Sequence, residues 1–219
     1  AAEPSAEKGM KTMDKRTWMR GVAAVMLVAG SPWALAQTTP DALIKQVSTE
    51  VLDAVKADKA IQAGDVKRIT ALVDAKIMPH VDFEGMTRFV MGQYARQSTP
   101  EQRQQLQVEF KQVLVRTYSG AFSMVKDQNL EFEPQRPSAD PAQAEVRSKI
   151  VGGGAEPIQL LYRLRKVGEA WKVYDVNVGG SWLAQNYRTQ YTQEIGKSGI
   201  DGLIKLLADR NKSAAGAKS

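Results

Sequence analysis

Apolar side chains recur at intervals of three and four positions through the first half of the chain, which is the pattern of helices with one buried face. The first segment of this kind follows Thr39-Pro40, a typical helix start, and its apolar stripe consists of Ile44, Val47, Val51 and Val55. Three further segments have the same spacing, at residues 65–77, 83–90 and 99–122. The sequence therefore predicts four helices before residue 125.

Two of these helices carry a specific start signal. Thr99 precedes Pro100 and stands three residues before Gln102, so the Thr99 hydroxyl and the Gln102 amide are expected to form a capping box. Asp82 directly precedes Phe83 and is expected to cap the third helix with its carboxylate. These signals place the starts of the third and fourth helices near residues 83 and 100.

After residue 127 the apolar period changes from about 3.6 to 2, which is the pattern of strands with one solvated face. Three segments alternate in this way and a fourth follows them, at residues 130–132, 146–150, 158–164 and 171–178. The fourth segment has apolar side chains on both faces, so we expect it to be central or covered on both sides. Gly179-Gly180 ends it, and helical spacing returns at residues 181–195 and 198–207.

Helices, then strands, then helices are the order of an α+β fold. We predict a single domain in which helices pack on one four-stranded antiparallel sheet. Asp175 interrupts the apolar fourth strand and is expected to share a face with Trp171 and Val173. A buried carboxylate needs hydrogen bonds or a cation, so Asp175 is interpreted as a structural anchor, with a role in a site as the alternative.

Composition narrows the chemistry that the domain can perform. The chain has 219 residues, of which 43% are hydrophobic and 25% charged, so it can bury a sizeable core. It contains no cysteine and one histidine, His80, which argues against disulfides, thiolate or histidine metal sites and histidine-dependent catalytic triads. His80 itself is expected to be a structural or surface residue. No metal site is predicted.

The N-terminal segment resembles a secretory signal peptide. Lys15, Arg16 and Arg20 precede an apolar run at residues 21–29, and Ala34-Leu35-Ala36 is a small-x-small cleavage motif. The run is shorter than the roughly 20 apolar residues that a membrane-spanning helix requires. We therefore expect cleavage after Ala36 and export from the cytoplasm.

This interpretation divides the chain into three parts. Residues 1–36 form an upstream extension plus a cleaved signal peptide, residues 37–210 form the domain, and residues 211–219 form a disordered tail. Removing the first part takes away five basic and three acidic residues and lowers the net charge from +6 to +4. The remaining excess is spread along the chain, so no nucleic-acid partner is expected.

Two segments together carry a resemblance to a known protein family. The first is VDFEGMTRFVMGQY at residues 81–94, with residues 99–102 and 109–118. The second combines WKVYDV at residues 171–176, NYR at residues 186–188 and GIDGLI at residues 199–204. They resemble the MlaC family, also called the toluene-tolerance or phospholipid-binding family of periplasmic ABC-system proteins. The resemblance extends over most of the chain after residue 41, although Trp182 stands where the family pattern has an aliphatic residue.

The resemblance implies a periplasmic carrier protein that is not an enzyme and has no cofactor. Its ligand would be a diacyl glycerophospholipid held in a hydrophobic cavity between sheet and helices. The carrier would shuttle phospholipid between an outer-membrane lipoprotein complex and an inner-membrane ABC transporter complex, maintaining outer-membrane lipid asymmetry. We expect lipid-binding residues on the inward faces of the sheet and its covering helices: Phe83, Met86, Phe110, Leu114, Tyr118, Val146, Ile150, Ile158, Leu160, Tyr162, Val173 and Trp182.

Two other functions stay open. A small hollow α+β enzyme would use Asp175 as an acid or base, and a structural adaptor for a membrane complex would have no cavity. Lipid that co-purifies with the protein would favour the carrier over both, because neither alternative requires a bound lipid.

Overall fold

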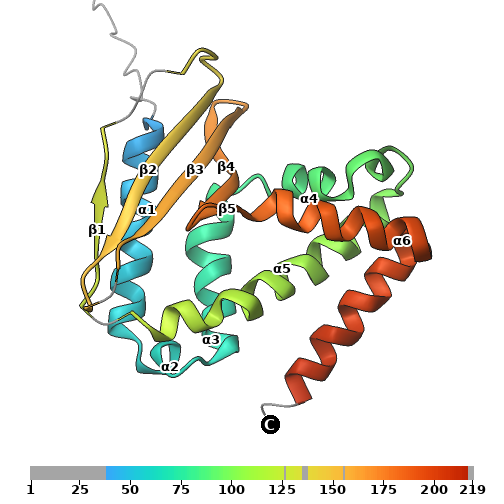
Figure 1. Ribbon diagram of the computed structural model, residues 1–219, viewed down its shortest axis with the longest axis horizontal. Coiled ribbons are helices and arrows are strands. Elements are labelled where there is room, and N and C mark those ends of the chain that lie inside the picture. Colours follow the sequence, from blue (N-terminus) through green and yellow to red (C-terminus); the bar gives the residue numbers. More distant parts are fainter. Residues whose placement is uncertain (1–37, 126, 135–137, 155, 217–219) are drawn as a thin grey trace, which may run out of the picture. The chain divides into compact units, whose positions relative to one another are not determined.

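The helices come first in the chain, the strands follow, and a long helix ends it (Figure 1). This computed structural model describes residues 38–125, 127–134, 138–154 and 156–216, so the signal peptide expected at residues 1–36 lies outside the described residues. The described residues belong to one structural unit, in agreement with the predicted single α+β domain.

The five helices before the sheet are α1 (Pro40–Ala57), α2 (Lys59–Gln62), α3 (Val66–Leu72), α4 (Phe83–Met91) and α5 (Pro100–Ser123). Four of them occupy the predicted segments, and the single turn α2 was not predicted. The second predicted helix does not stay α-helical. After α3 it widens to the π-helical η1 (Val73–Ile77) and then tightens to the 3-10 turn η2 (Met78–His80), and a second 3-10 segment, η3 (Gly92–Arg96), follows α4.

Both predicted caps are confirmed. The backbone N–H of Gln102 donates to the Thr99 hydroxyl at 3.1 Å, and the backbone N–H of Thr99 donates to Gln102 Oε1 at 3.0 Å. Asp82 Oδ1 accepts a hydrogen bond from Gly85 N at 2.9 Å. The other oxygen of Asp82 accepts from Arg165 Nε at 2.7 Å, so the same carboxylate that starts α4 also joins it to the sheet.

The sheet has five antiparallel strands in sequential order, so the prediction of four is wrong. The strands are β1 (Asn129–Phe132), β2 (Gln143–Val151), β3 (Ile158–Val167), β4 (Ala170–Val178) and β5 (Ser181–Trp182). Gly179 and Gly180 both have positive φ, 56° and 92°, and form a two-residue hairpin turn after β4. The chain therefore reverses, and β5 pairs with the end of β4 at a position that was expected to begin a helix.

Helix α6 (Leu183–Gly216) combines the two predicted C-terminal helices, with a kink at Gly199 where φ is 75°. It continues well past residue 210, so the disordered tail predicted at residues 211–219 is helical up to Gly216. Asn211 explains this extension. Its buried side-chain amide donates to the backbone oxygen of Glu109 at 3.1 Å and to Glu109 Oε2 at 2.7 Å, which fastens the end of α6 to α5.

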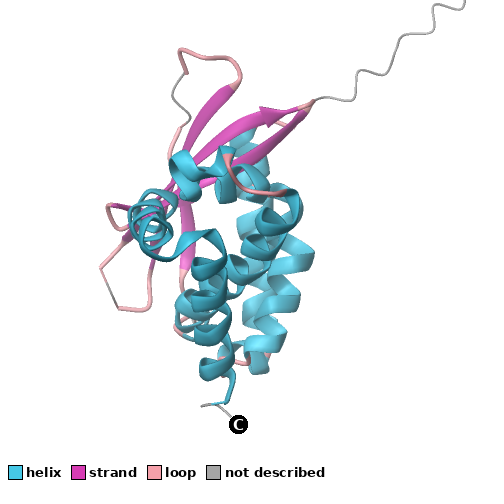
Figure 2. Ribbon diagram, turned by 90° about the vertical axis from the view of Figure 1, so that its right-hand side faces the viewer, coloured by secondary structure: helices cyan, strands magenta, loops and turns pink. Residues whose placement is uncertain are grey.

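Three groups of buried apolar side chains hold the elements together. Figure 2 shows the helices and strands after a turn of 90° from the view of Figure 1. The helix cluster joins α4, α5 and α6 around Phe83, Val90, Leu106, Phe110 and Leu203. The sheet cluster joins α1 to the sheet through Leu43, Ile44, Ala144, Val146, Leu164 and Val173. The lower cluster joins α1 to α2, α3 and α5 through Val55, Ile61, Ile69, Leu72 and Val115. Helix α1 is thus shared between the last two.

A β-bulge changes the face on which the second half of β4 places its side chains. Val173 lies opposite Leu164 on β3, whereas Val176 lies opposite Tyr162, which leaves one extra residue on β4 between these pairs. Because an extra residue inverts the alternation of a strand, Val173 and Val176 lie on the same face of the sheet.

The bulge places Asp175 on the other face, opposite Arg163, so the expectation that it shares a face with Trp171 and Val173 is wrong. There Asp175 Oδ1 accepts hydrogen bonds from Val176 N at 2.8 Å and Ala184 N at 2.9 Å, which ties β4 to the start of α6. Burial raises the pKa of the Asp175 carboxyl, while the two backbone hydrogen bonds and the Arg163 charge lower it by less.

The raised pKa of Asp175 predicts a pH-dependent effect of Asp175→Asn. The native state binds the proton of this carboxyl more tightly than the unfolded state does, so the wild-type protein loses stability as pH rises through the native pKa. Asparagine can accept the same hydrogen bonds without ionising. The difference in the free energy of unfolding, variant minus wild type, should therefore be more positive at about pH 7 than at about pH 4. Chemical denaturation followed by tryptophan fluorescence measures this difference, and an equal difference at both pH values would contradict it.

Candidate functional site

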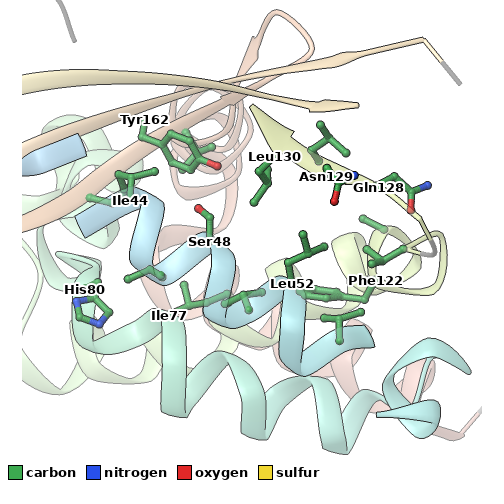
Figure 3. A pocket seen from close by; sticks show the side chains of 18 of the residues that line it. Ile44, Ser48, Leu52, Ile77, His80, Phe122, Gln128, Asn129, Leu130 and Tyr162 are labelled. Atoms are coloured by element: carbon green, nitrogen blue, oxygen red, sulfur yellow. The ribbon is translucent and has the colours of Figure 1, made fainter. Parts of the chain in front are cut away.

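A pocket of about 310 Å³ lies between the inner face of the sheet and helices α1 and α5 (Figure 3). It separates the sheet cluster from the lower cluster and touches both, since Ile44 and Val173 belong to the first and Val55 to the second. The lining of the pocket is almost entirely apolar.

Among single helices and strands, α1 supplies the most lining residues: Ile44, Val47, Ser48, Val51, Leu52 and Val55. The sheet supplies Asn129, Leu130, Ile150, Tyr162, Val173 and Val176, and the end of α5 with the following loop supplies Ala121, Phe122, Val125 and Gln128. The remaining wall comes from Ile77, His80 and Val81, in and after the π-helical and 3-10 segments. Val176 reaches the pocket because of the bulge in β4.

The width of the apolar face of α1 explains why a pocket forms beside it. The six lining positions follow the spacing i, i+3, i+4, i+7, i+8 and i+11, which gives a broader stripe than a helix needs for one contact surface. The first half of α1 packs on the sheet and its last turns pack on α3 and α5. The middle of the stripe, around Ser48 and Leu52, faces the pocket (Figure 3).

Two hydroxyl groups are among the exceptions to the apolar lining, which also include the side chains of His80, Gln128 and Asn129. Tyr162 extends from β3 into the pocket, and Ser48 extends from α1 toward it (Figure 3). Burial raises the pKa of the Tyr162 phenol, and interactions with the hydroxyls of Ser148 and Ser48 offset only part of this rise. The phenol is therefore protonated at neutral pH and can donate a hydrogen bond inside the pocket.

His80 lies at another part of the wall and is half-buried. Burial lowers the pKa of its imidazole, and the nearby charge of Lys172 lowers it further, while Glu50 raises it by less. The Lys172 ammonium group donates to the backbone oxygen of Pro79, and Lys76 forms an ion pair with Glu50 at 2.7 Å. His80 is therefore neutral at neutral pH. In the part of the chain that the structure describes, no three His, Asp or Glu side chains are grouped so as to hold a metal ion.

The twelve residues expected to contact lipid lie in several places. Ile150, Tyr162 and Val173 line the pocket. Phe83, Met86 and Phe110 are buried in the helix cluster, and Leu114 packs against it. The Phe110 ring lies 5.4 Å from the Phe83 ring and 5.0 Å from the Tyr187 ring, so these aromatic side chains fill a solid core between α4, α5 and α6.

The other five predicted residues are also outside the pocket lining. Val146 is buried in the sheet cluster, Leu160 and Tyr118 are half-buried, and Ile158 is exposed. Trp182 lies against the guanidinium group of Arg163, which is 3.7 Å from the centre of its ring. Contact between lipid and any of the twelve residues stays a prediction.

None of the twelve expected lipid-binding residues lies on α1, although α1 lines the pocket. Val47, Val51 and Val55 were recognised as one buried stripe, but a stripe facing a solid core has the same spacing as one facing a pocket. The unusual signal was the combination of Ser48 and Leu52 with this stripe, because together they make it wider than the sheet can cover.

Comparisons with known proteins agree with this architecture. The model of the MlaC protein family matches residues 45–209. A solved structure, the phospholipid-binding protein from Ralstonia solanacearum in complex with a phospholipid, is 39% identical to the chain with a TM-score of 0.76, and the match covers 82% of this chain and 99% of that one.

Two curated proteins are similar over most of their length. The toluene tolerance protein ttg2D of Pseudomonas putida is 28% identical over 81% of this chain and 82% of its own. The intermembrane phospholipid transport system binding protein MlaC of Haemophilus influenzae is 25% identical over 78% of this chain and 81% of its own. With the family model matching across both the helices and the sheet, the chain belongs to the MlaC family.

Proposed function

We propose that this protein is a phospholipid carrier of the periplasm, which holds acyl chains of a diacyl glycerophospholipid in the pocket between α1 and the sheet. The observation that carries the proposal is the nearly continuous apolar lining of this pocket, found in a member of the MlaC family. The phospholipid bound to the similar Ralstonia solanacearum protein supports the choice of ligand.

The energetics of acyl chains explain why such a carrier is useful. Each buried CH₂ group stabilises a bound chain by about 0.8 kcal/mol relative to water, so a phospholipid does not cross an aqueous compartment unaided at a useful rate. Moving a chain from a membrane into an apolar pocket exchanges one hydrocarbon environment for another. Modest differences in docking can then decide the direction of transfer, and no catalytic group is needed.

The size of the pocket constrains how the lipid is held. A volume of about 310 Å³ lies at the lower end of the roughly 300–1,000 Å³ range of ligand pockets. Within this proposal, the pocket as it stands accepts part of the acyl region, and two full chains require its walls to move apart.

The name of the similar Haemophilus influenzae protein, an intermembrane phospholipid transport system binding protein, supports a proposal for the route. We propose that the carrier exchanges lipid with an outer-membrane lipoprotein complex and an inner-membrane ABC transporter, and so contributes to outer-membrane lipid asymmetry. A signal peptide at residues 1–36 would deliver the protein to the periplasm. None of the helices in the described part of the chain is long and apolar enough to cross a bilayer.

The alternative of an enzyme that uses Asp175 receives no support from the geometry. Asp175 lies on the opposite face of the sheet from Val173 and Val176, which line the pocket. Its carboxylate accepts two backbone hydrogen bonds that join β4 to α6, so its position is explained by its structural role.

The first test is the ligand itself. Protein purified without detergent should carry diacyl phospholipid at a near-stoichiometric level, measured by mass spectrometry of an organic extract. Little headgroup selectivity is expected because the pocket is proposed to hold the acyl region. An extract without phospholipid would contradict the carrier function.

The second test places a charge on the pocket wall. Val47→Glu puts a carboxylate among the acyl chains, where an unpaired charge costs several kcal/mol or forces protonation. The phospholipid that co-purifies with the variant should fall by more than about tenfold.

Val108→Glu is the matched control, because Val108 lies on helix α5 and is 49% exposed. This variant should keep both its lipid and its thermal unfolding transition. Normal lipid content in folded Val47→Glu, or an equal loss in both variants, would show that the α1 wall does not hold the acyl chains.

A further inference from the structure

The hydroxyl groups of Tyr162 and Ser48 lie in a pocket whose lining is almost entirely apolar apart from them and the side chains of His80, Gln128 and Asn129. Phenylalanine and alanine would leave a wall of nearly the same shape, and the Tyr162 phenol interacts only with other neutral hydroxyls here, those of Ser148 and Ser48. Purely apolar acyl chains gain nothing from either group. Their presence suggests a ligand that has a polar atom at this depth.

The strands on both sides of β3 hold Tyr162 in place. It lies on β3 between Val146 of β2 and Val176 of β4, so its backbone is held by a strand on each side. Its hydroxyl points into the pocket, and Ser48 approaches it from α1 on the opposite wall (Figure 3). Ser148, on the neighbouring strand, is fully buried and contributes a third hydroxyl close to the phenol.

The chemistry of the polar atom follows from the type of donor. Tyr162 and Ser48 are neutral hydroxyls, and none of the described residues that line the pocket is Lys or Arg. A phosphate at this position would be an anion without a buried cation, which is costly. A carbonyl oxygen is neutral, is a good acceptor and can receive a hydrogen bond from the phenol.

We propose that Tyr162 and Ser48 form a polar subsite for the carbonyl oxygen of an acyl ester. The proposal rests on the carrier function above and adds where the glycerol end of the lipid lies. An ester bound between β3 and α1 sets how deeply the acyl chain enters the pocket. It also makes the carrier prefer ester-linked over ether-linked lipids, because an ether linkage has no carbonyl group.

The test compares two lipids that differ only in this group. The protein is incubated with vesicles containing equal amounts of diacyl and dialkyl-ether phosphatidylcholine with chains of the same length, then separated from the vesicles and analysed by mass spectrometry. Wild-type protein should be enriched in the ester lipid by about 3- to 10-fold, the ratio expected for one neutral hydrogen bond. In Tyr162→Phe the ratio of ester to ether lipid should fall to about one.

Tyr174→Phe is the matched control. Tyr174 also lies in the sheet, but its hydroxyl donates to Gln143 Oε1 at 3.3 Å and does not line the pocket. This variant should keep the wild-type ratio. Ser48→Ala should lower the ratio in part, and it tests the same subsite if Tyr162→Phe does not fold.

The outcomes separate this inference from the proposed function. Wild-type protein that takes up neither lipid would overturn the carrier function. Uptake of both lipids in equal amounts, or an unchanged ratio in folded Tyr162→Phe, would overturn the ester subsite and leave the carrier function intact. A third incubation adds palmitic acid to the vesicles. Preferential uptake of palmitic acid that is lost in Tyr162→Phe would assign these hydroxyls to a free carboxyl group and overturn the ester assignment.

Discussion

The pocket depends on one constraint, which is that α1 must pack against two different surfaces. Its first half contacts the sheet through Leu43 and Ile44, and its last turns contact α3 and α5 through Val55. The middle of the helix is only partly covered, because Val47 packs against the sheet cluster and Val51 against the lower cluster. The pocket of about 310 Å³ lies between these two surfaces.

The bulge in β4 serves both sides of the sheet at once. By inverting the alternation between Val173 and Asp175, it adds Val176 to the apolar wall of the pocket and turns the carboxylate toward the start of α6. A regular strand would place Asp175 beside Val173 and so put a carboxylate among the lining residues. One extra residue therefore keeps the pocket free of an acidic group and provides the hydrogen bonds that attach α6.

The sequence predicted the helices and strands better than it predicted which side chains line the pocket. The stripe of α1, the Thr99 capping box and four strands follow from local rules, and each is confirmed. The strand β5 was missed because two residues are too short to show a period, and the glycine pair before it was the only signal. Periodicity places both Phe110 and Val47 on buried faces. Phe110 lies in a solid core because α4 and α6 pack around it, whereas Val47 lines the pocket.

The two walls of the pocket are attached in different ways. The sheet is joined to α4 by the Asp82 and Arg165 side chains and to α6 by Asp175, and these charged hydrogen bonds have defined directions. Gly85 belongs to this joint, because a Cβ atom there would lie 1.8 Å from Arg165 Nη2.

The opposite wall, α1 with the π-helical segment after α3, is held by apolar contacts and by ion pairs at the surface such as Lys76 with Glu50. Surface ion pairs contribute about 0–1 kcal/mol, and apolar contacts can be exchanged for contacts with an acyl chain at little cost. The two walls therefore differ in kind: directional hydrogen bonds join the sheet to α4 and α6, whereas apolar contacts and surface ion pairs hold α1.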